Sequence, residues 1–283
     1  MKIINTIADI QHYVAAVKAT GKRVAFVPTM GNLHKGHLSL VKQAKLLADV
    51  VIVSIYVNPL QFGADEDFDA YPRTMEQDCE QLIAYNTDVL YAAASDEIYP
   101  EGSEKHTHVS VDILDCMHCS NTRPAFFRGV ATVVAKLFNI VRPDVAVFGE
   151  KDYQQLTIVK KMVSDMCIPV EVIGAPTVRE KSGLAMSSRN NYLTDTERQH
   201  IAPAVYRTLL QAREAIVAGE RDYQAVRARA FASLSEAGIK PDYFNVSHPL
   251  TLQPAEPDEK DLVILAAGYL GKARLIDNLY FSI

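Results

Sequence analysis

The chain has 283 residues, of which 48% are hydrophobic and 22% are charged, and its formal net charge is -5 at pH 7. This length allows one large domain or two smaller ones with substantial cores. The acidic balance argues against a protein whose main task is to bind nucleic acid, and no apolar run reaches the roughly 18 residues that a transmembrane helix needs.

The amino terminus and the cysteines bear on the compartment. Residues 1–6 lack the apolar core and cleavage site of a signal peptide, so we expect a cytoplasmic protein. Four cysteines are too few for a disulfide framework in a chain of this length. Cys116 and Cys119, with His118 and other histidines nearby, could bind zinc or act as a redox pair. Their spacing matches no common zinc motif, so we expect reduced thiols and no metal site built from the protein.

Strands and helices alternate over the first 176 residues. Short apolar runs predict strands at residues 24–27, 50–57, 89–91, 145–148 and 170–173. Helical periodicity predicts helices from about residue 38 and over residues 75–85, 129–141 and 153–166. This alternation predicts an α/β fold with a Rossmann-like, doubly wound parallel sheet.

The pattern changes after about Pro176. A capping box at residues 194–197 opens a helix to about residue 217, a second helix covers 223–237, and strands follow at 262–267 and 273–276. We therefore expect a Rossmann-like domain over residues 1–176. A smaller α+β domain is expected over residues 177–283.

The segment between the first strand and the next helix, residues 28–37, reads Pro-Thr-Met-Gly-Asn-Leu-His-Lys-Gly-His. A helix N-terminus offers unpaired N–H groups and partial positive charge, so it attracts phosphate. Gly31 and Gly36 let the backbone approach a ligand, and His34 and His37 can donate hydrogen bonds to phosphate oxygens. A nucleotide site is therefore favoured over half of a zinc site, which the His-x-x-His spacing would also allow.

Three further segments follow strands or the domain boundary. Residues 149–152 (Gly-Glu-Lys-Asp) follow a strand and open a helix, and in an open parallel sheet ligands bind at such carboxyl ends. Residues 58–73 form a loop long enough to be a lid, and we expect its acidic residues (Asp65, Glu66, Asp67 and Asp69) to be solvated rather than to bind Mg²⁺. Residues 186–190 (Met-Ser-Ser-Arg-Asn) could neutralise charge on a polyphosphate.

These segments resemble a known family. Residues 28–37 resemble the HIGH motif, and residues 186–189 the KMSKS-type loop, of the nucleotidylyltransferase superfamily. Four longer strings, at residues 28–37, 57–62, 71–74 and 149–156, narrow the resemblance to the pantoate–β-alanine ligases. The resemblance extends to Arg-Leu-Ile-Asp-Asn at residues 274–278.

The resemblance implies an ATP-dependent ligase that joins (R)-pantoate to β-alanine. A pantoyl adenylate would form first with release of pyrophosphate, and β-alanine would then displace AMP. ATP is thus a substrate, Mg²⁺ would be held mainly by its triphosphate, and a homodimer is the family's habit. The small-molecule partners are ATP, pantoate and β-alanine, with neither nucleic acid nor membrane among them.

The resemblance also assigns roles to domains and residues. The domain expected at 1–176 would bind nucleotide and pantoate, and the smaller one would carry the KMSKS-like loop. Catalysis falls on His34, His37, Lys151 and Arg189, with His37 as the proton donor. Pantoate would be bound by Gln61 and Gln155, and Gln61 would also lie near β-alanine. Contacts with ATP fall on a longer series: Met30, Gly31, Asn32, Leu33, His34, Lys35, Gly36, His37, Gly149, Glu150, Lys151, Asp152, Val178, Met186, Ser187, Ser188 and Arg189.

One segment departs from the family, and two alternatives stay open. The usual Arg-Pro-Gly-His-Phe-Arg-Gly is here Arg-Pro-Ala-Phe-Phe-Arg-Gly, with Ala125 and Phe126 replacing glycine and histidine. A nucleotidylyltransferase acting on a phosphate monoester is the nearest alternative, but such a substrate calls for more arginine or lysine than the two glutamines supply. An aminoacyl-tRNA synthetase shares both signature loops but needs a tRNA-binding surface that this acidic chain hardly offers.

Overall fold

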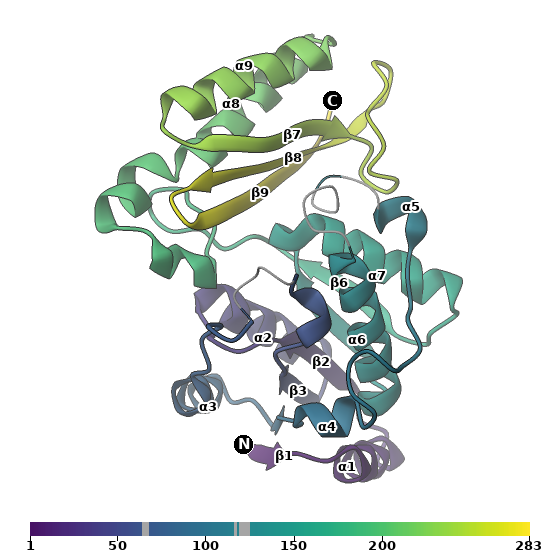
Figure 1. The fold of residues 1–283 in the computed structure, drawn as a ribbon. Coiled ribbons are helices and arrows are strands. Elements are labelled where there is room, and N and C mark those ends of the chain that lie inside the picture. The colour runs from purple at the N-terminus through teal and green to yellow at the C-terminus, as the bar shows by residue number, and fades with distance from the viewer. Residues whose placement is uncertain (64–67, 116–117, 119–124) are drawn as a thin grey trace. The chain divides into compact units, whose positions relative to one another are not determined.

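The computed structural model describes residues 1–63, 68–115, 118 and 125–283. The chain forms two compact units (Figure 1). The first is drawn from residues 1–115, 123–150 and 155–176, and the second from residues 116–122, 151–154 and 177–283. Because the second unit also takes in residues 151–154, the two domains expected at 1–176 and 177–283 stay a prediction.

The first unit is a parallel α/β sheet with short connections. Its strands and helices, in chain order, are β1 (Lys2–Ile4), α1 (Ile7–Ala19), β2 (Val24–Thr29), α2 (Lys35–Leu47), β3 (Val50–Ile55), α3 (Met75–Ala84), β4 (Val89–Tyr91), α4 (Ser95–Ile98), α5 (Asp112–Asp115), α6 (Phe126–Val141), β5 (Val145–Gly149), α7 (Tyr153–Asp165) and β6 (Glu171–Ala175). A single turn of 3₁₀ helix, η1 (Pro59–Gln61), follows β3, and a second, η3 (Glu150–Asp152), follows β5.

The strand order explains where a ligand site can form. In the described residues the sheet has six strands in the order β1-β4-β3-β2-β5-β6, and every pair is parallel. From β2 the chain builds outward through β3 and β4, then returns to place β5 on the other side of β2. The order therefore reverses between β2 and β5, where open α/β sheets bind their ligands. The predicted Rossmann-like class is confirmed.

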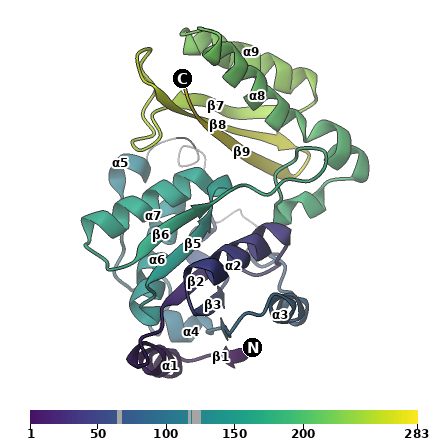
Figure 2. The ribbon, with the colours of Figure 1, turned by 180° about the vertical axis from the view of Figure 1, so that it is seen from behind.

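Both faces of this sheet are covered, which is why its central strands are almost wholly apolar. All six residues of β3 are buried. On one face α2 contributes Leu38, Val41 and Ala44 to a core with residues of β2, β3 and β5. Figure 1 shows α6 in front of the sheet, and the opposite view in Figure 2 shows α2 in front.

The second unit is a layer of helices on an antiparallel sheet. Its strands are β7 (Lys240–Ser247), β8 (Asp261–Leu270) and β9 (Ala273–Ser282), and among the described residues these three form one sheet in that order. The helices α8 (Ala204–Val217) and α9 (Tyr223–Glu236) cover one face (Figures 1 and 2). Their apolar stripes meet the sheet in a core that includes Leu209, Leu234, Phe244 and Ile264.

The structure corrects several predicted elements. The strand β1 and the helix α1 were not predicted. The strand has only three residues and two of them are exposed, so it shows no apolar run. The strand β7 was also missed, because it begins Lys-Pro-Asp and carries an irregularity between Pro241 and Tyr243. The helix predicted from the capping box to residue 217 is broken: a π-helical turn, η5 (Glu197–Ile201), precedes Pro203, and α8 begins after it. Proline has no N–H to continue a helix but suits its first positions.

Candidate active site

The histidine segment occupies the carboxyl end of β2, beside the point where the strand order reverses. The backbone turns sharply there, with φ values of 80° at Gly31 and 49° at Asn32. Glycine is favoured at residue 31 for a second reason: a Cβ would lie 3.0 Å from Ile55 Cγ2 and 3.1 Å from Asp78 Oδ2. The helix α2 then begins at Lys35, about one turn earlier than predicted.

His34 is the N-cap of α2, and this role fixes its tautomer. Its Nδ1 accepts a hydrogen bond from the Gly36 amide at 3.1 Å. An acceptor nitrogen carries no proton, so the ring proton lies on Nε2, which becomes the donor. The rings of His34 and His37 stack with centroids 4.0 Å apart at 27°. Two imidazoles thus stand side by side at the positive end of a helix, as the sequence predicted.

A carboxylate distant in sequence holds this turn in place. Asp78, in α3, is 1% exposed and accepts hydrogen bonds from the amides of Asn32 at 2.9 Å and Leu33 at 2.8 Å. The hydroxyl of Thr74 donates to the same carboxylate at 3.2 Å. Sequence reasoning missed Asp78, since nothing in the chain signals that one acidic residue of a surface-type helix is buried.

Gln61, predicted to bind pantoate, lies in η1 and is 8% exposed. The amide of Asn58 donates to Gln61 Oε1 at 2.9 Å and to the carbonyl of Gly129 at 3.1 Å. Tyr99 completes the chain of contacts, because its hydroxyl donates to Asn58 Oδ1 at 3.1 Å. Burial raises the pKa of Tyr99, so its hydroxyl stays protonated and remains a donor. The Gln61 oxygen is therefore an acceptor toward Asn58, and its NH₂ group is the donor of this side chain.

A close approach of α6 supports the same turn. A Cβ on Gly129 would overlap the carbonyl oxygen of Leu60, so no other residue fits there without moving the backbone. Gly129 therefore lets α6 pack directly on the backbone of η1. Asn58 and Tyr99 were not predicted as site residues, although Asn58 stands within a string that carries the family resemblance.

The other residues predicted in the first unit lie at the second carboxyl end. The strands β2 and β5 are hydrogen-bonded neighbours, and β2 leads into the histidine segment. Gly149 ends β5, and Glu150 directly follows it. Gln155 lies in the first turns of α7 and is half-buried. Their roles toward ATP and pantoate stay predictions.

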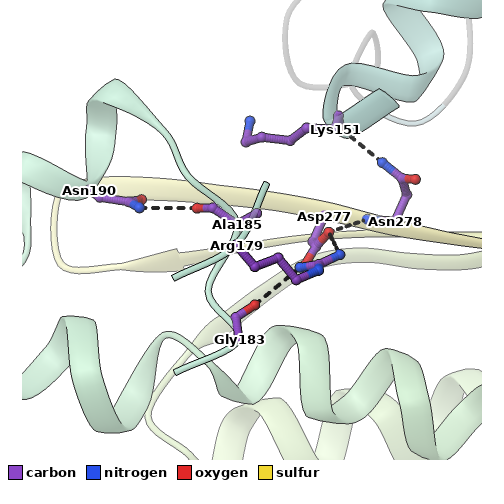
Figure 3. Close-up of polar contacts among 7 residues, drawn as sticks. All are labelled: Lys151, Arg179, Gly183, Ala185, Asn190, Asp277 and Asn278. Carbon is purple, nitrogen blue, oxygen red and sulfur yellow. Dashed lines mark hydrogen bonds and ion pairs between the residues drawn. The ribbon is translucent and has the colours of Figure 1, made fainter. Parts of the chain in front are cut away.

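Lys151 and Asp152 belong to the second unit. The Lys151 ammonium lies 3.6 Å from Asp152 Oδ1, and the Lys151 side chain is 17% exposed. Its main-chain carbonyl accepts a hydrogen bond from the Asn278 side chain at 2.9 Å (Figure 3). A cation is thus held largely out of water, where it acts more strongly on a nearby anion.

The loop predicted to contact phosphate, residues 186–189, directly follows a short hairpin in the same unit. Arg179 and Ala185 form an antiparallel bridge, and the Met186 amide donates to the carbonyl of Val178 at 2.9 Å. Ser187 then caps the 3₁₀ turn η4 (Ser188–Tyr192), accepting from the Arg189 amide at 3.3 Å. The loop that carries Met186, Ser187, Ser188 and Arg189 is therefore an ordered turn on a hairpin stem.

A small pocket that is partly open to solvent lies within this unit. Its lining includes Lys151, Ser187, Asn190, Tyr206 and Asp277. Two groups of predicted ATP contacts, Lys151 and the loop, thus border one hollow. The side chain of Asn190 anchors the end of the loop, because it donates to the carbonyl of Ala185 at 3.0 Å and to Glu180 at 3.1 Å.

Some predictions fall outside the described residues. These are the acidic residues Asp65, Glu66 and Asp67, the thiols Cys116 and Cys119, and the Arg-Pro pair before Ala125. Within the described residues, no group of three or more His, Cys, Asp or Glu side chains is placed to hold a metal ion. No helix in the described part of the chain is long and apolar enough to cross a membrane.

Comparison with known proteins decides the family. The sequence model of the family described as pantoate-beta-alanine ligase matches residues 2–280. The pantothenate synthetase of Pseudomonas putida (strain W619) is 53% identical over 280 residues, which cover 99% of this chain and 97% of that protein. The chain belongs to the pantoate–β-alanine ligase family. The resemblance carried by the four strings is thereby confirmed.

Solved structures agree with the fold. The pantothenate synthetase of Thermus thermophilus is similar with a TM-score of 0.88 and 44% identity, over 99% of each chain. The pantoate-beta-alanine ligase of Francisella tularensis, described as complexed with beta-gamma ATP and beta-alanine, has a TM-score of 0.81 and 35% identity. That match covers 99% of this chain and 97% of the Francisella protein. The names of these relatives agree with the predicted ligase class, and the complex of the Francisella protein agrees with the prediction of ATP as a substrate.

Proposed function

We propose that the chain condenses (R)-pantoate with β-alanine to give pantothenate, consuming ATP and releasing AMP and pyrophosphate. The observation that carries this proposal is the stacked histidine pair at the N-terminus of α2, beside the point where the strand order reverses. A site of that kind handles negative charge on a nucleotide, and family membership supplies the acyl acceptor and donor.

The chemistry has two steps. A pantoate carboxylate oxygen attacks the α-phosphorus of ATP, the bond to the bridging oxygen breaks, and pyrophosphate leaves. The amine of β-alanine then attacks the acyl carbon of the adenylate, loses a proton and expels AMP. Adenylation is needed because a free carboxylate is a poor acyl donor, and the phosphate ester is a good leaving group.

The residues of the first unit stabilise the negative charge that builds up in the first step. The α2 N-terminus and His34 Nε2 direct N–H groups toward phosphate oxygens, and His37 donates a proton or hydrogen bond beside it. Preorganised donors of this kind stabilise the transition state more than the ground state. Gly149 and Glu150, at the end of β5, approach the ribose and phosphates.

The residues of the second unit add positive charge and further contacts with the nucleotide. Lys151 supplies a positive charge, Asp152 accepts from ribose hydroxyls, and Val178 flanks the adenine. Met186, Ser187, Ser188 and Arg189 cover the phosphates. An arginine suits this role because its planar guanidinium forms paired hydrogen bonds with phosphate.

Pantoate is bound by Gln61 and Gln155. A neutral amide can donate to the carboxylate and accept from hydroxyl groups, and it leaves the nucleophilic carboxylate uncompensated by a full positive charge. The contact from Asn58 to Gln61 Oε1 supports donation by the Gln61 NH₂ group.

Mg²⁺ accompanies the nucleotide. Mg²⁺ usually binds through one or two carboxylates and substrate phosphates rather than through a complete protein cage. When bound, the ion neutralises charge on the triphosphate. A homodimer remains an expectation that sedimentation or light scattering can check.

Isotope exchange between labelled pyrophosphate and ATP tests the proposal. We expect exchange that requires pantoate and proceeds without β-alanine, because only the adenylation step is reversible under those conditions. Exchange with a phosphate monoester in place of pantoate would instead establish a different nucleotidylyltransferase.

A further inference from the structure

Two neighbouring residues of β9, Asp277 and Asn278, each contact a segment of the predicted ATP site within the second unit. Both are buried, at 5% and 7% exposed. They pair in register with Ala266 and Leu265 of β8, so their backbone is fixed by the sheet. Neither has been given a role in the reaction proposed above.

Asp277 holds the stem of the phosphate-loop hairpin. Its two carboxylate oxygens accept from the two terminal nitrogens of Arg179, at 2.5 Å and 2.9 Å. Arg179 also donates to the carbonyl of Gly183, and its guanidinium lies 3.6 Å from the centroid of the Tyr206 ring. A paired, stacked guanidinium has little freedom, so the strand that contains Arg179 is tied to β9.

The position of the loop follows from that of the stem. Arg179 is bridged to Ala185, which directly precedes residues 186–189. On the other side of the loop, the side-chain NH₂ of Asn190 donates a hydrogen bond to the carbonyl of Ala185. The contact of Asn190 with Ala185 and the ion pair of Arg179 with Asp277 are drawn in Figure 3. A displacement of Arg179 would therefore move the four loop residues together.

Asn278 holds the second segment. Its side-chain NH₂ donates to the Lys151 carbonyl at 2.9 Å, while its own backbone amide donates to Asp277 Oδ1 at 2.8 Å. The Asp277 carboxylate thus links the two anchors through one shared oxygen, since Oδ1 also accepts from Arg179.

From this arrangement we infer that Asp277 and Asn278 are positioning residues for adenylation: they fix the spacing between the Lys151 ammonium and the Met186–Arg189 loop around the phosphates of ATP. This inference rests on the proposed function. It adds two residues that need not touch substrate, and it requires that they act on the first step rather than on the whole reaction. The reason is that aminolysis of a bound adenylate no longer involves the pyrophosphate.

The test compares the two half-reactions in the full-length chain. Asn278→Asp keeps the shape of the side chain but replaces the donor with an acceptor that faces the Lys151 carbonyl. We expect pantoate-dependent pyrophosphate–ATP exchange to fall by at least about tenfold, a difference of about 1.4 kcal/mol in the transition state. Release of pantothenate from chemically supplied pantoyl adenylate and β-alanine should change by less than about threefold.

Asn245→Asp is the matched control. It makes the same substitution in β7 of the same sheet, where the Asn245 side chain contacts His118 and not Lys151. We expect it to leave the ratio of the two half-reactions at the wild-type value. Asp277→Asn should behave like Asn278→Asp, since it weakens the hold on Arg179.

The outcomes separate the possible failures. Equal loss in both half-reactions would mean a merely structural role and would overturn the inference, as would unchanged exchange in Asn278→Asp. If Asn278→Asp does not fold, as judged by circular dichroism, Asn278→Ser is measured by the same criteria. Absence of pantoate-dependent exchange in the wild-type chain would instead refute the proposed function.

Discussion

His34 and His37 stack at the same helix entrance, but their environments differ. His34 uses Nδ1 to cap α2, so substitution of His34 alters the helix as well as the site. His37 lies within the first turn and is the cleaner probe of chemistry.

We expect His37→Ala to lower the rate of pantoate-dependent pyrophosphate–ATP exchange by about 100- to 1000-fold, the usual effect of removing one preorganised donor. The far-ultraviolet circular dichroism spectrum should be unchanged. His12→Ala, at an exposed position of α1, is the control. Near-normal exchange by His37→Ala would remove His37 from the mechanism.

The orientation of Gln61 gives a second prediction at this scale. Tyr99→Phe removes the hydroxyl that donates to Asn58 and keeps the ring. Loss of one such hydrogen bond is worth about 0.5–1.5 kcal/mol, so KM for pantoate should rise about 2- to 13-fold while KM for ATP stays constant.

Tyr56→Phe is the matched control for Tyr99→Phe. Its hydroxyl pairs with Ser95 at 3.0 Å, and its ring lies 6.2 Å from that of Tyr99. Steady-state kinetics with pantoate as the varied substrate would decide. An equal effect of the two variants would mean that Asn58 does not transmit the contact.

At the scale of elements, the start of α6 carries backbone strain. Ala125 is the N-cap and has φ 67° and ψ -3°, a left-handed conformation that residues with a Cβ seldom adopt. The family pattern has glycine at this position, and glycine adopts the conformation freely. The departure noted in the sequence therefore has a structural cost in this chain.

We expect Ala125→Gly to raise the free energy of unfolding by about 1 kcal/mol in urea denaturation. Ala218→Gly provides the opposite control, because Ala218 ends α8 with an ordinary φ of -74°. There the substitution should leave stability unchanged or lower it by up to about 1 kcal/mol. Destabilisation by Ala125→Gly would mean that the strain is relieved by the rest of the turn.

The elements also show what sequence patterns can and cannot predict. The buried strands β2, β3 and β5 were predicted because both faces are covered and their residues are almost all apolar. The strand β7 was not, because it begins with Lys-Pro-Asp and its pairing is irregular between Pro241 and Tyr243. The two histidines were found through local spacing, which a chain displays directly.

The supporting residues of the site could not be found in this way. Asp78 meets Asn32 across 46 residues, and Asp277 meets Arg179 across 98. Such pairs depend on the packing of whole elements, and a single acidic residue looks the same whether it is solvated or buried. The family strings included Asp277 and Asn278 but gave no physical reason for them.

At the scale of the whole molecule, His118 links stability to pH. It is 8% exposed, its Nε2 donates to the carbonyl of Leu252 at 3.0 Å, and its Nδ1 accepts from the Asn245 amide at 2.8 Å. Burial lowers the pKa of His118 below its ordinary value of 6.5. The folded chain therefore holds this imidazole neutral in a range where the unfolded chain protonates it.

The free energy of unfolding should consequently fall as pH drops below about 6.5, by at most about 1.4 kcal/mol from this group at pH 5.5. His118→Gln should reduce the difference between unfolding measured at pH 7.5 and at pH 5.5. His12→Gln, on the exposed side of α1, should not. A pH dependence that is identical in wild type and His118→Gln would contradict this account.

The long sequence separation of the β9 contacts has a consequence for how the molecule matures. Lys151 and Asn278 are 127 residues apart, and Arg179 and Asp277 are 98 apart. Contacts that close such long loops form late in folding, because their entropy must be lost before the contact is gained. A folding intermediate in which β9 has not yet joined β8 lacks both anchors, although its helices can already be formed. The fixed spacing between Lys151 and the stem of the 186–189 loop should thus appear only with the final cooperative step of folding.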